Sequence, residues 1–284
     1  MKKILVTGRT GGISNGFKEY LTESFPNDYK VSLITVRNNE WRKEDFSEYD
    51  AVYHCAGAVT GTTEELKKIN VLLSEELFRK AVSDGSRMFI YLSSMAVYRF
   101  DNLKRPMGGI IDSETVLNGQ TDYGKSKIEA EEHIRAIDPK STTLAIIRAP
   151  DVFGRKSEQV LEMYAKALEL PVFPLLSAEY KRSILYIDCL SELVRLIVET
   201  NQGGIYCPQN IPRLSTNEII REIKKVLRKR TLLLELPSFL EIRCQFINKR
   251  FGNQCYTEDF SKAFNNLYCI VDTYDAIQKT LQGN

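Results

Sequence analysis

Five short apolar runs, rich in β-branched residues, alternate with amphipathic stretches through the first half of the chain. They are residues 4–7 (ILVT), 31–36 (VSLITV), 51–57 (AVYHCAG), 88–94 (MFIYLSS) and 144–150 (LAIIRAP). Strands that are almost continuously apolar are typical of parallel sheets with helices on both faces. The pattern therefore predicts an α/β fold in which residues 1–150 form a Rossmann-type, doubly wound, NAD(P)-binding domain.

The pattern loosens beyond residue 150, where we expect a smaller C-terminal α/β lobe, residues 151–284, that mainly binds substrate. A helix is predicted from about residue 158 to 168, followed by a proline-marked loop at 171–176. A strand and a helix within 182–200 are expected to pack back on the Rossmann domain. Farther along, Ser215 or Thr216 can cap a helix whose first turn contains Glu218.

The connection between the second and third strands is unusually short. It spans about 14 residues, fewer than a complete helix and strand require. We therefore expect one αβ unit of the usual sheet to be missing. Trp41 falls in this stretch, and we expect it to cover the adenine end of the sheet rather than to take part in catalysis.

Composition and charge exclude several classes of protein. The 39 Lys and Arg nearly balance the 37 Asp and Glu, without long runs of one sign, so we expect neither a nucleic-acid nor a membrane partner. No stretch reaches the roughly 18 apolar residues of a membrane-spanning helix, and Gly8 and Arg9 interrupt the first run before a signal-peptide core forms, which favours the cytoplasm. Six scattered cysteines and two histidines predict reduced thiols and no metal site.

Residues 6–14 (VTGRTGGIS) leave the first strand and open a predicted helix, which is the setting of a dinucleotide-binding loop. Glycines there permit a tight turn and let backbone amides approach a pyrophosphate at the helix N-terminus. Ser14 takes the position where a third glycine is usual, and it is small enough to fit. An ordinary glycine-rich turn is the alternative. The candidate cofactor-binding residues in this loop are Gly8, Thr10, Gly11, Gly12 and Ile13.

The end of the second strand favours NADP(H) over NAD(H). A carboxylate at this point normally binds the ribose hydroxyls of NAD, but this chain has Thr35, Val36 and Arg37. With Arg37, Arg42 and Lys43 nearby, a 2′-phosphate would meet cations rather than repulsion. The alternative is that these cations are solvated surface residues.

Tyr123 and Lys127 form a candidate acid/base pair. They lie four residues apart where a helix is predicted to begin, so they share one helix face. A tyrosine with an ordinary pKa of about 10 is a poor base at neutral pH, but a nearby ammonium and an oxidised nicotinamide both favour the phenolate. Ser93 and Ser94, at the end of the fourth strand, can hold a substrate oxygen. Each motif alone is common by chance, and their order along the chain gives them weight.

Taken together, TGRTGGIS, HCAG, SSMAVY, YGKSK, RAPDVFG and RSILYID resemble the extended short-chain dehydrogenase/reductase family, in particular its NAD(P)-dependent nucleotide-sugar epimerases and reductases. The resemblance covers nearly the whole chain. It implies that Ser94 is the catalytic hydroxyl, that Tyr123 transfers the proton, and that Lys127 also binds the nicotinamide ribose. Ala56 and Gly57 would line the cofactor.

The resemblance assigns roles to four further residues. Asn70 matches an asparagine near the active site and is a candidate cofactor residue, with a helix-surface asparagine as the alternative. Arg182 matches an arginine that binds the diphosphate of a nucleotide sugar, with a surface salt bridge as the alternative. The counterpart of Asp188 is structural, and His54 is expected to be a packed, hydrogen-bonded ring.

Departures from the family pattern restrict the chemistry. Dehydratases carry an Asp-Glu pair directly after the catalytic hydroxyl, and this chain has Met95 and Ala96 there, which argues against sugar 4,6-dehydration. Arg99 replaces a usual glycine and Ala149 a usual proline. Both changes affect the identity of the sugar more than the hydride chemistry.

Three functions remain open. The leading hypothesis is an NAD(P)-dependent oxidoreductase that reduces a 4-keto group or oxidises a 4-hydroxyl of a nucleotide-diphosphate sugar, in polysaccharide or deoxysugar biosynthesis. The second is a nucleotide-sugar 4-epimerase with tightly bound NAD. The third, from another class, is a non-catalytic NADP(H) sensor, against which the intact Ser94, Tyr123 and Lys127 argue. The family also implies a homodimer.

Overall fold

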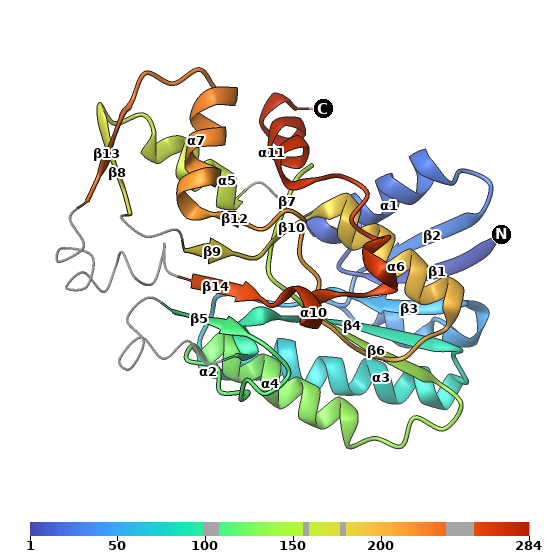
Figure 1. Ribbon diagram of the computed structural model, residues 1–284. Helices are drawn as coiled ribbons and strands as arrows, with labels where there is room; N and C mark the ends of the chain where they lie inside the picture. Colours follow the sequence, from blue (N-terminus) through green and yellow to red (C-terminus); the bar gives the residue numbers. More distant parts are fainter. Residues whose placement is uncertain (99–107, 156–158, 177–179, 237–252, 284) are drawn as a thin grey trace.

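The computed structural model describes residues 1–98, 108–155, 159–176, 180–236 and 253–283 (Figure 1). Its centre is a six-stranded, all-parallel sheet in the order β2-β1-β3-β4-β6-β11. The strands are β1 (Lys2–Thr7), β2 (Tyr29–Ile34), β3 (Ala51–His54), β4 (Met88–Ser94), β6 (Thr143–Ala149) and β11 (Gly204–Tyr206). Together with the covering helices, this sheet confirms the predicted Rossmann-type α/β fold.

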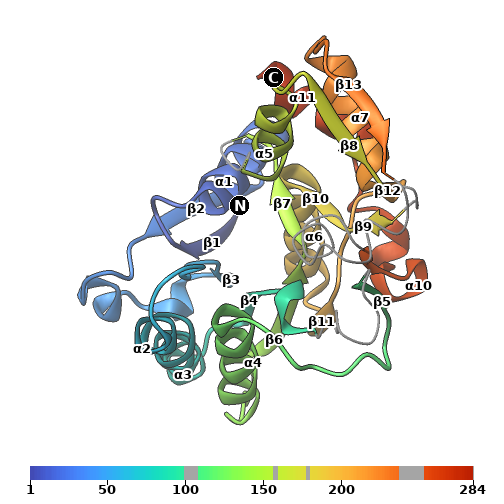
Figure 2. The ribbon, with the colours of Figure 1, turned by 90° about the vertical axis from the view of Figure 1, so that its left-hand side faces the viewer.

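Helices cover both faces of the sheet (Figure 2). Successive strand residues point to opposite faces, and because these strands are almost continuously apolar, both faces must be buried. Ile4 and Val6 of β1 pack with α1 (Gly12–Ser24) and α6 (Ile187–Thr200) in one core. Leu5, between them, packs with α3 (Leu73–Asp84) and α4 (Asp122–Arg135) in another. The short α2 (Thr63–Leu66) precedes α3 on that second face. Burial on both faces explains why the strands lack alternating polar residues.

The connection from β2 to β3 contains no α-helix and no strand. It has two 3-10 turns, Glu40–Lys43 and Phe46–Glu48. The missing αβ unit is therefore confirmed. Trp41 is buried in the first turn, with its ring centroid 6.4 Å from that of Phe46.

The chain returns to the sheet after residue 182. Strand β10 (Ile184–Tyr186) leads into α6, which packs on α1, and Tyr20 of α1 donates a hydrogen bond to Glu192 of α6 at 2.8 Å. Strand β11 then pairs with β6 and completes the sheet. The predicted boundary at residue 150 therefore crosses the sheet, because its last strand comes from residues 204–206.

The second lobe lies beyond the carboxyl ends of the strands, and in Figure 1 it includes α7, β8 and β13. Its largest sheet has the order β12-β9-β14-β5, and two pairs, β10-β7 and β13-β8, complete its strands. The remaining strand bounds are β5 (Gly108–Ile111), β7 (Asp151–Phe153), β8 (Val172–Leu175), β9 (Lys181–Arg182), β12 (Leu214–Ser215), β13 (Leu232–Glu235) and β14 (Asn253–Tyr256). The helices are α5 (Gln159–Ala167), α7 (Thr216–Val226), α10 (Glu258–Ser261) and α11 (Thr273–Gln282).

The prediction of a loop at 171–176 is wrong, since β8 occupies most of it. Phe173 and Leu175 are buried while Val172 and Pro174 are exposed, which is the alternation of a half-buried strand. Among the described strands, β8 pairs with β13 alone, and a strand with one neighbour tolerates Pro174. Two prolines in six residues concealed the strand.

The α7 cap confirms one of the two predicted residues. Ser215, not Thr216, is the N-cap, and its side chain accepts a hydrogen bond from the backbone of Glu218 at 3.1 Å. The Glu218 carboxylate in turn accepts one from the backbone of Ser215, which completes a capping box. Among the helices described, none is both long and apolar enough to cross a membrane.

Candidate active site

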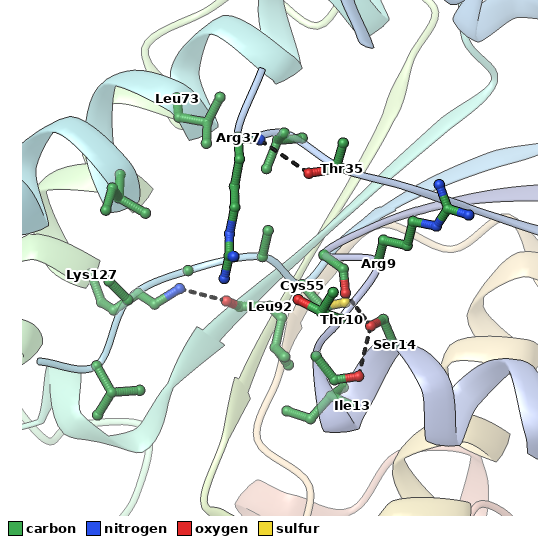
Figure 3. A pocket seen from close by; sticks show the side chains of 18 of the residues that line it. Arg9, Thr10, Ile13, Ser14, Thr35, Arg37, Cys55, Leu73, Leu92 and Lys127 are labelled. Atoms are coloured by element: carbon green, nitrogen blue, oxygen red, sulfur yellow. Dashed lines mark hydrogen bonds between the residues drawn. The ribbon is translucent and has the colours of Figure 1, made fainter. Parts of the chain in front are cut away.

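A groove of about 1160 Å³ runs along the carboxyl ends of the central strands (Figure 3). Ligands bind at this edge in open α/β sheets. Eleven of the thirteen predicted site residues line the groove: Gly8, Thr10, Gly11, Gly12, Ile13, Arg37, Ala56, Gly57, Ser94, Tyr123 and Lys127. The structure thus gathers these residues, from five segments of the chain, into one site. Asn70 and Arg182 lie outside the lining and are described below.

The glycine loop leaves backbone amides open at the N-terminus of α1. Gly8 has a φ of +94°, and a Cβ there would lie 3.3 Å from Cα of Ala56, so this position requires glycine. Gly11 is the N-cap of α1 and provides no side-chain cap. Ser14 is buried, and its hydroxyl donates to the carbonyl oxygens of Gly8 and Gly11. Ser14 therefore fits where a third glycine is usual, and it also braces the loop.

Of the three cations predicted near the adenosine end, Arg37 is the one without an ion pair within the described ranges. Its side chain extends across the groove in Figure 3. Arg42 binds Glu76 through two nitrogen atoms, at 2.6 and 2.7 Å, and stacks on Trp41, while Lys43 pairs with Glu40 at 3.0 Å. Two of the three predicted cations are thus paired with carboxylates, so less positive charge is available to a phosphate than the sequence suggested.

Tyr123 and Ser94 meet where the first turn of α4 packs on the turn after β4. Thr121 caps α4 by accepting a hydrogen bond from the backbone of Gly124 at 3.0 Å. A Cβ on Gly124 would collide with the carbonyl oxygen of Ala96, so glycine permits this close approach. Ser94 and Tyr123 both line the groove, and the Ser94 side chain is close enough to lower the pKa of Tyr123. Two hydroxyl groups therefore face one point of the groove.

The pKa of Tyr123 is raised in the structure, whereas the sequence pattern predicted that a nearby Lys127 would lower it. Burial raises the pKa of Tyr123, and the side chain of Ser94 acts in the opposite direction. Burial also lowers the pKa of Lys127 to about 8. The Lys127 ammonium donates to the backbone oxygen of Leu92 at 2.9 Å and to the hydroxyl of Tyr91 at 3.2 Å. Lys127 is not among the groups that shift the pKa of Tyr123, so burial keeps this pKa above its ordinary value in the protein alone.

A buried charged network behind the site was missed at the sequence level. The Ser93 hydroxyl donates to Glu131 at 2.5 Å, and Arg148 binds the same carboxylate at 2.6 Å. Arg148 also donates to the hydroxyl of Tyr98 at 2.8 Å. Glu131 lies one turn after Lys127 and opposes the lowering of its pKa. The signal available was an arginine in an otherwise apolar strand, together with a glutamate four residues after the lysine.

Asn70 lies in a π-helical turn, Lys67–Leu72, and is fully buried, so the alternative of a helix-surface asparagine is wrong. Its amide exchanges two hydrogen bonds of 2.8 Å with the backbone of Ala58 and donates to the hydroxyl of Ser126 at 2.9 Å. It therefore joins the 56–58 loop to the helix of Tyr123 and Lys127, from behind the groove.

Arg182 binds Asp151 at 2.9 Å. Asp151 itself lines the groove, although it was not among the predicted site residues. Asp188 binds Arg155 at 2.7 Å, which agrees with a structural role.

His54 is a packed core residue, as predicted. Its two ring nitrogens lie 2.7 Å from the hydroxyl of Thr7 and 2.8 Å from that of Ser74, and burial lowers its pKa to about 3. Five of the six cysteines are described, and all five are free thiols. No three His, Cys, Asp or Glu residues within the described ranges could hold a metal ion together. Arg99 and Cys244 lie outside the described residues.

A parallel Rossmann-type sheet, a glycine loop at its first strand and a Ser-Tyr-Lys set at its edge define the class of short-chain NAD(P)-dependent oxidoreductases. A family model described as the NAD dependent epimerase/dehydratase family matches residues 4–207. The chain belongs to this family. The family and the enzyme class predicted from the motifs are thereby confirmed.

Individual relatives are distant but extend over the whole chain. The curated UDP-glucose 4-epimerase of Vibrio cholerae is 24% identical over 311 aligned positions, covering 99% of this chain and 87% of the epimerase. A dTDP-4-dehydrorhamnose reductase from Bacillus anthracis, solved with NADP, has a TM-score of 0.73 and 16% identity, covering 100% of this chain and 99% of that one. A UDP-glucuronic acid 4-epimerase from Bacillus cereus, solved with NAD, has a TM-score of 0.73 and 18% identity, covering 99% and 98%. These likenesses show a shared fold.

Proposed function

We propose that this protein is an NAD(P)-dependent reductase or dehydrogenase of nucleotide-diphosphate sugars that acts at a ring 4-keto or 4-hydroxyl group. The observation that supports this most is the placement of Ser94, Tyr123 and Lys127 in the same groove as the glycine loop. The groove, at about 1160 Å³, exceeds the roughly 300–1,000 Å³ of an ordinary small-molecule pocket. The names of the relatives, which include a reductase and two epimerases of nucleotide sugars, support the substrate class.

The protein's own groups divide the work along the groove. The open amides at the start of α1 hold the pyrophosphate, and Lys127 holds the nicotinamide ribose. Ser94 and Tyr123 bind the substrate oxygen, and the phenol of Tyr123 gives up or takes its proton. When bound, the nicotinamide supplies or accepts the hydride. Because its oxidised form is cationic, it also favours the phenolate that the protein alone disfavours.

We further propose that the exchanging cofactor is NADP(H), with the guanidinium of Arg37 on the 2′-phosphate. A bidentate contact suits a guanidinium, and Arg37 extends into the groove (Figure 3). Arg37→Ser should weaken NADPH binding about tenfold, the usual size of one charge-assisted contact, and leave NADH binding unchanged. Fluorescence titration of both cofactors measures this. Equal losses for NADPH and NADH would contradict a 2′-phosphate contact.

A 4-epimerase is the second candidate, favoured by the full-length match to the UDP-glucose 4-epimerase of Vibrio cholerae. An epimerase must retain its cofactor through oxidation and re-reduction, whereas a reductase exchanges it. Mass spectrometry and absorbance of the denatured, purified protein distinguish the two. Tightly held NAD would favour the epimerase and contradict the NADP(H) proposal, while an empty protein that binds NADPH on titration supports the reductase.

The biosynthetic role and the homodimer rest on the family resemblance, and the cytoplasmic location rests on the apolar pattern of the sequence. We propose a role in polysaccharide or deoxysugar biosynthesis, a cytoplasmic location and a homodimer. Sedimentation velocity over a range of protein concentrations measures the last of these.

A further inference from the structure

The carboxylate of Asp151 lies at the substrate end of the groove, and none of the steps above uses it. Asp151 is the first residue of β7 and follows Pro150 directly. It lines the groove together with Ser94 and Tyr123, and its side chain is 45% exposed. A ligand bound beside Tyr123 can therefore reach it.

Asp151 also balances the charge of the arginine that the family resemblance assigns to the diphosphate. Parallel pairing of β7 with β10 sets Asp151 opposite Ile184, two residues after Arg182. The Arg182 guanidinium, whose side chain is 11% exposed, donates to the carboxylate at 2.9 Å. A diphosphate that binds Arg182 competes with Asp151 for the guanidinium, which leaves the negative charge of the carboxylate less fully paired.

The field of Asp151 acts on the acid/base itself. It raises the pKa of Tyr123, in the same direction as burial. A sugar ring whose oxygen is held by Tyr123 is then within reach of the same negative charge. A carboxylate accepts hydrogen bonds from ring hydroxyls, but it repels a second carboxylate in a groove partly screened from water.

We propose that Asp151 is a specificity-determining residue that accepts hydrogen bonds from hydroxyls of the sugar ring and excludes sugars that carry a ring carboxylate. The substrates are then nucleotide-diphosphate hexoses with an uncharged ring, and uronic acids are rejected. This inference rests on the proposed function and narrows its substrate class.

The test compares two ligands that differ in one group. UDP-glucose and UDP-glucuronic acid, which carries a carboxylate in place of the hydroxymethyl group, are titrated into the NADP(H)-loaded protein by calorimetry. The same pair with thymidine in place of uridine is titrated in parallel. The wild-type protein should bind the neutral sugar about tenfold more tightly, the effect of one like-charge contact in a partly exposed site. In Asp151→Asn this ratio should fall to about one.

Glu258→Gln is the matched control. Glu258 pairs with Arg213 at 2.9 Å, the same distance as Asp151 from Arg182, but it lies on α10 and does not line the groove. The ratio should remain at its wild-type value. NADP(H) affinity checks the fold of each variant, and Asp151→Ala replaces Asp151→Asn if the amide variant does not fold.

Two results would overturn the inference separately from the proposed function. The first is equal binding of neutral and acidic sugars by the wild-type protein, and the second is an unchanged preference in Asp151→Asn. Either result would show that Asp151 does not determine sugar specificity, while the protein would still be an enzyme of nucleotide sugars. Failure of all four nucleotide sugars to bind a protein that does bind NADP(H) overturns the proposed function together with the inference.

Discussion

The two ends of the groove are built from different parts of the chain. At the cofactor end, the glycine loop offers backbone amides at the start of α1, and the Ser14 hydroxyl braces its turn by donating to the backbone of Gly8 and Gly11. At the substrate end, Ser94, Tyr123 and Asp151 come from three separate segments, and Asp151 pairs with Arg182 from a fourth. A binding site made of backbone amides depends on one conformation of the chain. A binding site made of side chains can change its ligand through single substitutions. This difference explains how one fold accepts many sugars with one class of cofactor.

The sharpest separation of the two ends is expected from Tyr123→Phe. Loss of the phenol removes the proton donor, so turnover should fall by about 10²–10⁴-fold, the usual contribution of a general acid or base. Cofactor affinity should stay near the wild-type value, because the glycine loop is unchanged. Initial rates with NADPH and a nucleotide 4-keto sugar, together with NADPH titration, measure both quantities. Retained turnover would exclude Tyr123 as the proton donor, and lost NADPH binding would show that the two ends are not independent.

Lys127 joins the two ends, and its titration provides a second test. Its pKa is about 8 in the folded protein against 10.5 as the reference value, so the unfolded chain binds more protons between these pH values. Stability relative to Lys127→Met should therefore rise with pH across this window, by about 2 kcal/mol between pH 7.5 and 9.5. This gain in stability is lost as the pH falls to below the folded pKa of about 8, because the buried amine is then charged in the folded protein as well.

Urea unfolding of both proteins at the two pH values measures this difference. A wild-type advantage that does not depend on pH would mean that Lys127 is not desolvated as the structure indicates.

A smaller effect is expected from Gly8→Ala at the cofactor end. The positive φ costs a Cβ-bearing residue about 1–2 kcal/mol, and the contact with Ala56 adds to it. NADPH affinity should fall about tenfold or more, because the loop must shift. Gly85→Ala is the matched control, since Gly85 has a φ of +78° with nothing within 4 Å of its Cβ position. Gly85→Ala should lower the stability of the protein without changing its affinity for NADPH. An equal loss of NADPH affinity in both variants would show that backbone strain in general, and not the glycine loop, weakens binding.

The sequence alone determined five of the six strands of the central sheet, the glycine loop and the Ser-Tyr-Lys set. Apolar strands and a loop directly after the first strand are local features, because residues close in the chain form them. The short connection between β2 and β3, the packed His54 and the α7 cap were predicted correctly for the same reason.

Only the tertiary structure decided which charged residues face the ligand. Arg42 and Lys43 are neutralised by Glu76 and Glu40, and the pairing of Asp151 with Arg182 joins strands about 30 residues apart. Glu131 and Arg148 are buried together, although each is a polar residue that composition alone places at the surface. An ion pair depends on the positions of both partners in space, and no local pattern specifies the second one. Charge at the site is therefore a property of the fold, while the site's location is already present in the sequence.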